Sequence, residues 1–235
     1  MGETFDIYTL LFLVLAVVII LRLRSVLGQK RGPERPYEVA RDTRQAGKDK
    51  VIPMTRSEPL SRSAADKASI EDAERRVRDF LPAANPATEG LLSIVRQDQA
   101  FDPKHFLNGA KSAYETVVTA FAEGNRKLLK QLLSRDVFDG FVGAISEREG
   151  RGEAVDTNFV GIDRTDIIEA ELKNRTARVT VKFVSQLITS IRNRGGEIID
   201  GDPKQIREVT DIWTFAREVT SGDPNWKIVA TQAAN

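Results

Sequence analysis

The sequence predicts an α+β protein with an N-terminal transmembrane helix, followed by helices that pack on a curved antiparallel sheet. Three observations support this fold class. An uncharged, mostly apolar run spans Ile7–Leu21. Between Asn85 and Gly150, apolar residues recur every three or four positions, which is typical of amphipathic helices. After Gly152 the period changes to two, which is typical of strands that bury one face.

The amino-acid composition excludes several kinds of functional site. The 235-residue chain has no cysteine, which excludes disulfides, thiolate nucleophiles and cysteine-ligated metal sites. It has one histidine, His105, so a site with several histidine ligands is excluded as well. We therefore expect no metal and no cofactor. Residues 81–235 carry 20 Lys and Arg against 22 Asp and Glu, a balance that argues against nucleic-acid binding.

The apolar run predicts a membrane-spanning helix over residues 5–27. This segment is long enough to cross a hydrocarbon core of about 30 Å. Tyr8 suits one headgroup region, and Arg22 and Arg24 can extend to the other. A cleaved signal peptide is the alternative. The residues before the run are acidic, however, and two arginines follow it directly, which favours a retained anchor.

The basic residues that follow the run predict its orientation. Residues 22–50 carry nine Lys and Arg against four Asp and Glu, and no Lys or Arg precedes the run. By the positive-inside rule, the N-terminus lies outside and the rest of the chain lies in the cytoplasm. With anionic lipid as a candidate partner, the side chains expected to contact the membrane surface are Arg22, Arg24, Lys30 and Arg31.

Residues 28–84 predict a charged, flexible linker, because prolines interrupt any long helix and few large apolar residues are present. The alternative to lipid contact is that the basic part of this linker is a solvated spacer. Apolar residues at helical spacing predict a short amphipathic helix over residues 69–81. The folded domain is expected over residues 85–235.

The domain is expected to begin with four helices. Asn85 and Asp102 each combine a capping side chain with a following proline, so helices are predicted over Pro86–Ala100 and Pro103–Glu123. A third helix, around Leu128–Leu133, and a fourth, around Val137–Ile145, follow, and the fourth ends at Gly150.

The strands are expected to form an antiparallel meander, because they are consecutive and joined by turns. Their predicted positions are about residues 158–173, 177–191, 208–218 and 226–231. Asn174-Arg175 predicts a turn between the first two strands, and glycines between the second and third predict a longer connection.

A sheet that curves over helices tends to leave an apolar cavity between the two layers. The aromatic residues expected to line it are Phe106, Tyr114, Phe121, Phe138, Phe141, Phe183 and Trp213. The alternative is that these rings fill the core. An open pocket would accept a lipid tail or a partner side chain.

Several segments of the predicted domain resemble the Tim-forty-four-like domain family. The segments that carry the resemblance are Phe106–Phe121, Leu128–Asp139, Phe159–Ile162, Asp211–Phe215 and Asn225–Gln232. They occur in consistent order across roughly residues 90–235. The apolar run and charged linker resemble those of bacterial, membrane-anchored members of the family.

The resemblance implies a cone-shaped fold like that of nuclear transport factor two, with a large apolar pocket, in a single-pass protein of the bacterial inner membrane. The mitochondrial relative tethers a heat-shock chaperone motor to the inner-membrane import channel. It contacts cardiolipin through helices that correspond here to about Pro86–Glu123. This chain differs from that relative in its expected membrane helix and in lacking the long chaperone-binding region, so the resemblance leaves chaperone recruitment and the bacterial role open.

Three functions from different classes follow. The first is a membrane-tethered adaptor that presents the domain to other membrane or peripheral proteins, in protein translocation or membrane-protein assembly. The second is a module that binds lipid or a small molecule in the apolar pocket. The third, an enzyme, is not expected, because catalysis needs a histidine or carboxylate with a perturbed pKa in the pocket. His105 suits a surface or capping role, and Asp211 suits a structural hydrogen bond or ion pair.

Overall fold

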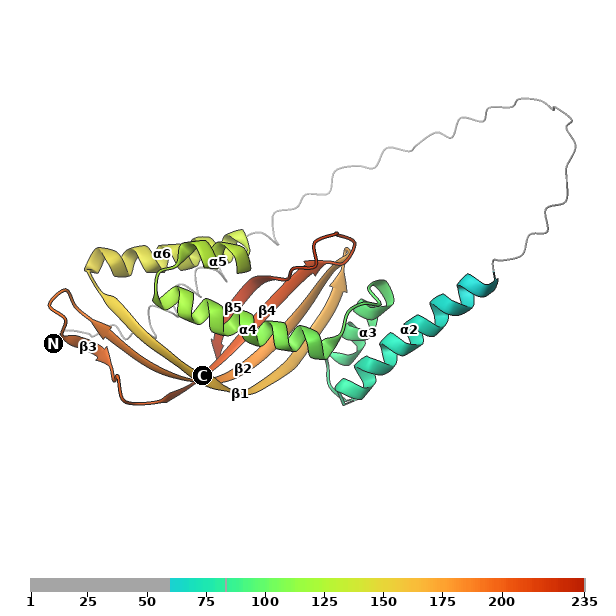
Figure 1. The fold of residues 1–235 in the computed structure, drawn as a ribbon, viewed down its shortest axis with the longest axis horizontal. Helices are drawn as coiled ribbons and strands as arrows, with labels where there is room; N and C mark the ends of the chain where they lie inside the picture. Colours follow the sequence, from blue (N-terminus) through green and yellow to red (C-terminus); the bar gives the residue numbers. More distant parts are fainter. Residues whose placement is uncertain (1–59, 83, 235) are drawn as a thin grey trace, which may run out of the picture.

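The computed structural model describes residues 60–82 and 84–234, which form an α+β fold (Figure 1). The predicted helices packed on a curved antiparallel sheet are confirmed. The predicted transmembrane helix, residues 5–27, lies outside the described residues, as do the four side chains expected at the membrane surface, Arg22, Arg24, Lys30 and Arg31. Among the helices of the described part, none combines the length and apolar character that a membrane span needs.

The first described helix, α2, spans Leu60–Phe80 and is longer than the 69–81 segment expected from the sequence. Ala73 and Val77, one helical turn apart, are fully buried, and α2 packs against the next helix, α3. Most of the rest of its described surface is charged, which is why its apolar pattern is weak. Helix α2 therefore belongs to the folded domain, and Figure 1 shows it at one end of the sheet, reaching away from the strands.

Two helices begin near the predicted caps. Helix α4 spans Pro103–Ala122, and the Asp102 side chain accepts a hydrogen bond from the His105 N–H at 2.7 Å. Helix α3 spans Thr88–Gln97 and begins slightly later than expected. The Asn85 side chain accepts a backbone N–H two residues on, at 2.8 Å, and so forms a tight turn ahead of the helix.

Helices α5 (Arg126–Leu132) and α6 (Arg135–Arg151) complete the helical layer. Arg148 ties α6 to α4, because its guanidinium donates hydrogen bonds to the carbonyls of Phe121 and Ala122 at 3.1 and 2.8 Å. These carbonyls end α4, where helical partners run out. The Phe121 carbonyl also accepts the Gly124 N–H at 3.2 Å, so Arg148 adds a second bond there and a bond to the Ala122 carbonyl.

Five antiparallel strands form one sheet: β1 (Ala154–Lys173), β2 (Thr176–Arg192), β3 (Ile198–Gly201), β4 (Arg207–Glu218) and β5 (Lys227–Ala234). The strand order is β1-β2-β4-β5, as a meander predicts, and β3 pairs with the far end of β2. The sequence did not predict β3, which lies in the stretch expected as a connection. Asn174 and Arg175 form the expected turn, both with positive φ, at 51° and 63°.

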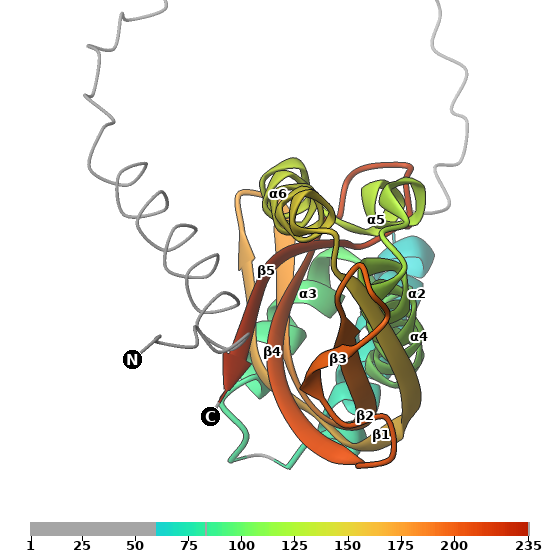
Figure 2. The ribbon, with the colours of Figure 1, turned by 90° about the vertical axis from the view of Figure 1, so that its left-hand side faces the viewer.

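The sheet curves because β1 is irregular. Its pairing with β2 shifts register at three places, Phe159/Gly161, Ile162/Arg164 and Ile167/Glu169. Each bulge bends the strand and increases its twist. Figure 2 shows the strands curving around the helical layer as a result. This curvature leaves space between the sheet and the helices at the end of α4.

Candidate binding cavity

An apolar cavity of about 330 Å³ lies between the end of α4, α6 and the concave face of the sheet near β3. Its apolar lining includes Val117, Val118, Phe121, Val137, Phe141, Ala144, Val155, Leu187, Ile191, Val209 and Trp213. Gly140 and Ala144, one turn apart on α6, also line it and are too small to fill it. The volume is within the usual range for a small-ligand site.

The structure divides the seven aromatic residues expected at the cavity into two groups. Phe121, Phe141 and Trp213 line it, and the rings of Phe121 and Phe141 lie 5.1 Å apart between α4 and α6.

The other four rings pack in the core. Phe106 contacts Phe215 and Trp226, with ring centroids 5.6 and 4.7 Å away. Tyr114 stacks on Phe183 at 4.5 Å, and Phe138 packs against the edge of the core.

A chain of hydrogen bonds crosses the core and ends at the cavity. The Tyr114 hydroxyl donates to Asp211 Oδ2 at 2.7 Å and lies 2.8 Å from Ser185 Oγ. A phenol has one proton to donate, so Ser185 donates to Tyr114 and Tyr114 donates to Asp211. Ser185 and Tyr114 are fully buried, whereas Asp211 lines the cavity. The chain therefore presents an acceptor group to the cavity.

Burial is the largest influence on the pKa values of Tyr114 and Asp211. It raises the pKa of the Asp211 carboxyl, and the hydrogen bond from Tyr114 only partly opposes that effect. Burial and the neighbouring carboxylate raise the pKa of the Tyr114 hydroxyl, so Tyr114 stays protonated. None of the ion pairs of residues 60–82 and 84–234 includes Asp211.

The charged side chains of the cavity lining are balanced when Asp211 is included. Arg148, Arg151 and Arg207 accompany Glu153, Asp200 and Asp211. Arg151 pairs with Glu153 at 2.8 Å, and Arg148 is held by the carbonyls that end α4. Desolvation lowers the pKa of Arg148. The cavity therefore combines an apolar body with a rim of mixed charge.

Sequence reasoning placed some of these residues and missed others. Asp211 was expected to form a structural hydrogen bond, and it does. It also lines the cavity and has a raised pKa, so the sequence-based reason for expecting no enzyme, that the pocket holds no perturbed carboxylate, does not hold. Ser185 and Arg148 were missed. The signal for Ser185 was present, because alternation puts it on the same apolar strand face as Val181 and Phe183. His105 lies on the exposed first turn of α4 and does not line the cavity.

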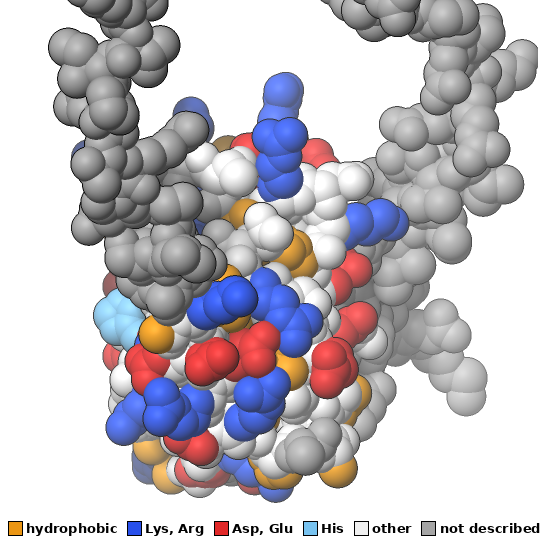
Figure 3. Space-filling view, turned by 90° about the vertical axis from the view of Figure 1, so that its right-hand side faces the viewer, with side chains coloured by type: hydrophobic (Ala, Val, Ile, Leu, Met, Phe, Trp, Pro, Cys, Tyr) orange, Lys and Arg blue, Asp and Glu red, His pale blue; other side chains and the backbone are white. Residues whose placement is uncertain are grey.

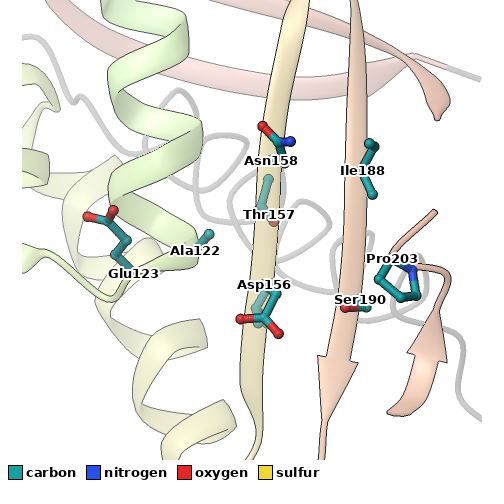
Figure 4. Close-up of a pocket in the computed structure, with 9 residues that line it drawn as sticks. Ala122, Glu123, Asp156, Thr157, Asn158, Ile188, Ser190 and Pro203 are labelled. Atoms are coloured by element: carbon teal, nitrogen blue, oxygen red, sulfur yellow. The ribbon is translucent and has the colours of Figure 1, made fainter. Parts of the chain in front are cut away.

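A second hollow of about 290 Å³ adjoins the cavity and shares Ala122, Val155 and Thr157 with it (Figure 4). It is more polar, with Glu123 at the end of α4 and Asp156 on β1. Asp156 is already paired with Arg192, at 2.8 Å. Because of this polar lining, the larger cavity is the better candidate for an apolar ligand.

Comparison with known proteins gives the family. The Tim44-like domain profile matches residues 87–233. The mitochondrial import inner membrane translocase subunit TIM44 of Homo sapiens is 23% identical over 151 residues, which cover 63% of this chain and 33% of that protein. TIM44-1 of Arabidopsis thaliana is 22% identical over 157 residues, 67% of this chain and 33% of that protein.

A Rickettsia prowazekii protein described as uncharacterized is 20% identical over 142 residues, 60% of this chain and 58% of that protein. Among solved structures, the intermembrane-space region of the chloroplast protein ARC6 matches with a TM-score of 0.38 and 12% identity, over 54% of this chain and 95% of that one. That likeness is too distant to inform function.

The chain spans about a third of the length of the human and plant relatives. The profile match is confined to the folded domain and includes the strands described above, except for the last residue of β5. Because the profile covers more than half of the sequence, the chain belongs to the Tim44-like domain family.

Proposed function

We propose that this protein is a membrane-tethered adaptor that presents its Tim44-like domain to other proteins at the cytoplasmic face of the bacterial inner membrane, and that it binds rather than catalyses. The observation that carries the proposal is family membership, because the human relative is named as a subunit of an inner-membrane import translocase. The tether rests on the apolar run at residues 7–21 and its basic flank.

The surface around α2 suits reversible contact with another protein. Glu74 on α2 pairs with Arg78 and with Arg96 of α3, each at 2.7 Å. Figure 3, which views this end of the domain, shows Lys and Arg interspersed with Asp and Glu. Mixed charge of this kind contributes orientation and partner selection more than raw affinity.

A membrane tether can compensate for the low affinity of such a surface. Confinement to the membrane raises the effective concentration of the domain for any partner in the same membrane, so weak contacts suffice. The domain then needs no large apolar interface.

Site-specific crosslinking of the full chain tests this function. A photoreactive residue at Arg75 on α2, or at Ile199 on β3, samples the two ends of the domain, and both positions are exposed. We expect a discrete adduct with an inner-membrane protein that disappears when residues 5–27 are deleted. Absence of any discrete adduct from both positions, or adducts that persist unchanged without residues 5–27, would count against the proposal.

A second function is favoured by the cavity. Its 330 Å³ and its mostly apolar lining suit a lipid tail or a small apolar molecule. Native mass spectrometry of the purified full chain tests this directly. We expect a bound ligand that Ala144→Trp, which fills the cavity, displaces. Gly143→Trp is the matched control, because Gly143 is exposed and a Cβ there meets nothing within 4 Å. Equal occupancy in both variants would rule out the cavity as the site.

A further inference from the structure

We propose that the cavity selects an apolar ligand that carries a cationic hydrogen-bond donor, and that Asp211 receives the protonated amine of this ligand. The inference rests on the second function above and names the class of ligand. It follows from three features: the direction of the hydrogen-bond chain, the missing counter-ion of Asp211 and the state of the other charges that line the cavity.

The direction of the chain makes Asp211 an acceptor. Ser185 donates to Tyr114, and Tyr114 donates to Asp211 Oδ2. Hydrogen bonds in such a series polarise one another toward the terminal acceptor. The other carboxylate oxygen, Oδ1, accepts no hydrogen bond from the described residues. One acceptor atom therefore remains for a donor that enters the cavity.

Asp211 also has no counter-ion among residues 60–82 and 84–234. A carboxylate in a poorly solvated site is costly unless a cation or several donors compensate it. Within the described residues, one donor contacts Asp211 and no cation does. Burial accordingly raises the pKa of this carboxyl, and in the part of the chain that the structure describes only the hydrogen bond from Tyr114 opposes the effect. An ammonium group from a ligand would supply both the missing charge and the missing donor.

The three arginines that line the cavity, Arg207 included, already have interaction partners and do not reverse this preference. Arg148 is held by the carbonyls of Phe121 and Ala122, and Arg151 by Glu153. The lining has three basic and three acidic side chains, so the cavity as a whole does not attract anions. The ligand body is apolar because the rest of the lining is, including Trp213 beside Asp211 on the same strand.

Calorimetric titration of the full chain with three eight-carbon ligands tests the inference. Octylammonium, octanol and octanoate share one apolar chain and differ only in the charge of the head group. A charge-assisted hydrogen bond predicts that octylammonium binds about tenfold to a hundredfold more tightly than octanol. We expect octanoate to bind most weakly of the three.

Variants assign the preference to Asp211. Asp211→Asn is expected to reduce the affinity for octylammonium to that for octanol. The control is Glu208→Gln, which removes an exposed carboxylate from the same strand and leaves the preference intact. Should Asp211→Asn fail to fold, the ratios of the three ligand affinities in the wild-type protein still test the proposed amine selectivity.

The outcomes separate this inference from the function on which it rests. Equal affinity for octylammonium and octanol, or tighter binding of octanoate, overturns the proposed amine selectivity but leaves ligand binding in the cavity standing. No binding of any of the three overturns both. A preference for octylammonium that survives Asp211→Asn also overturns the assignment to Asp211.

Discussion

The ionised form of Asp211 destabilises the folded protein, but it is the form that would bind the proposed amine ligand. Burial raises its pKa above the ordinary value of 3.8, so the folded state holds this proton more tightly than the unfolded state does. The folded state is therefore penalised as the pH rises from that ordinary value through the folded pKa. A carboxylate that costs stability in a cavity is typical of a functional group.

This penalty predicts a pH dependence with a definite sign. In Asp211→Asn the titrating group is gone, and the amide oxygen can still accept the hydrogen bond from Tyr114. We expect the melting temperature of the wild type, minus that of Asp211→Asn, to fall as the pH rises from about 4 to about 8. Asp163→Asn, which removes an exposed carboxylate, is the control for lost charge. A difference that rises over this range would contradict the burial of Asp211.

Arg175 carries a backbone cost that glycine would remove. It is an exposed residue with φ of 63° at the second position of the β1–β2 turn, where glycine is strongly preferred. We expect Arg175→Gly to raise the free energy of unfolding by roughly 0.5–1 kcal/mol, measured by urea denaturation. Arg178→Gly on β2 is the contrast, because there glycine only weakens a strand. Destabilisation by Arg175→Gly would show that this turn is not strained.

The individual residues of the hydrogen-bond chain could be identified in the sequence, but their association could not. Tyr114 lies on the apolar stripe of α4, and Asp211 is a charged residue among apolar neighbours of β4. Their hydrogen bond joins positions 97 apart in the chain, and that to Ser185 joins positions 71 apart. Periodicity assigns a residue to a face and does not align residues between elements.

At the scale of elements, α3 lies so close to β1 that a residue with a side chain at position 90 would overlap the strand. A Cβ at Gly90 would lie 1.8 Å from the carbonyl oxygen of Ala170. We expect Gly90→Ala to lower the free energy of unfolding by roughly 3 kcal/mol or more, since the overlap is with backbone. Gly109→Ala on α4 is the matched control, because a Cβ there meets nothing within 4 Å.

The control variant is expected to change the free energy of unfolding in the opposite direction. In the helix interior, alanine is favoured over glycine by roughly 0.5–1 kcal/mol, so Gly109→Ala should stabilise the protein. Both variants are measured by chemical denaturation. A Gly90→Ala variant as stable as Gly109→Ala would mean that α3 does not rest on β1 as closely as described.

A second link joins α3 to the sheet. Arg217 of β4 pairs with Asp98, the residue that ends α3, and its guanidinium lies 5.3 Å from the centre of the Trp226 ring. Both side chains of the pair are only 15% exposed. Removing one partner would leave a poorly solvated charge without compensation.

We therefore expect Arg217→Ala to cost roughly 2–4 kcal/mol of unfolding free energy, slightly below the range for fully buried pairs. Arg135→Ala is the comparison, because Arg135 pairs with Asp139 on an exposed face of α6 and its loss should change little. If both variants lose the same small amount in denaturation experiments, the Arg217 pair does not link α3 to β4.

The sequence predicted elements where strong local signals exist. Asp102-Pro103 identified the start of α4, and the change of period identified the strands and their meander. The strand β3 was missed because its four residues are too few for a period and its Ile198 and Ile199 are exposed. The full length of α2 was missed because it buries only a narrow stripe, and tertiary packing on α3 outweighs its weak pattern.

At the scale of the whole molecule, the two proposed functions use different parts of the domain. The surface around α2 and α3 lies at one end of the sheet, and the cavity lies toward the other end, near β3 and α6 (Figure 1). A partner at α2 would therefore leave the cavity accessible. The two proposed functions can therefore be tested separately.

The proposed adaptor function requires the apolar run to anchor this domain on the cytoplasmic side of a membrane. Paired C-terminal fusions to a fluorescent protein that matures only in the cytoplasm, and to a phosphatase active only in the periplasm, test it most directly. We predict fluorescence in the membrane fraction and no phosphatase activity, with release to the soluble fraction when residues 5–27 are deleted. An active phosphatase fusion, or a fluorescent one that is soluble with residues 5–27 in place, would contradict the claim.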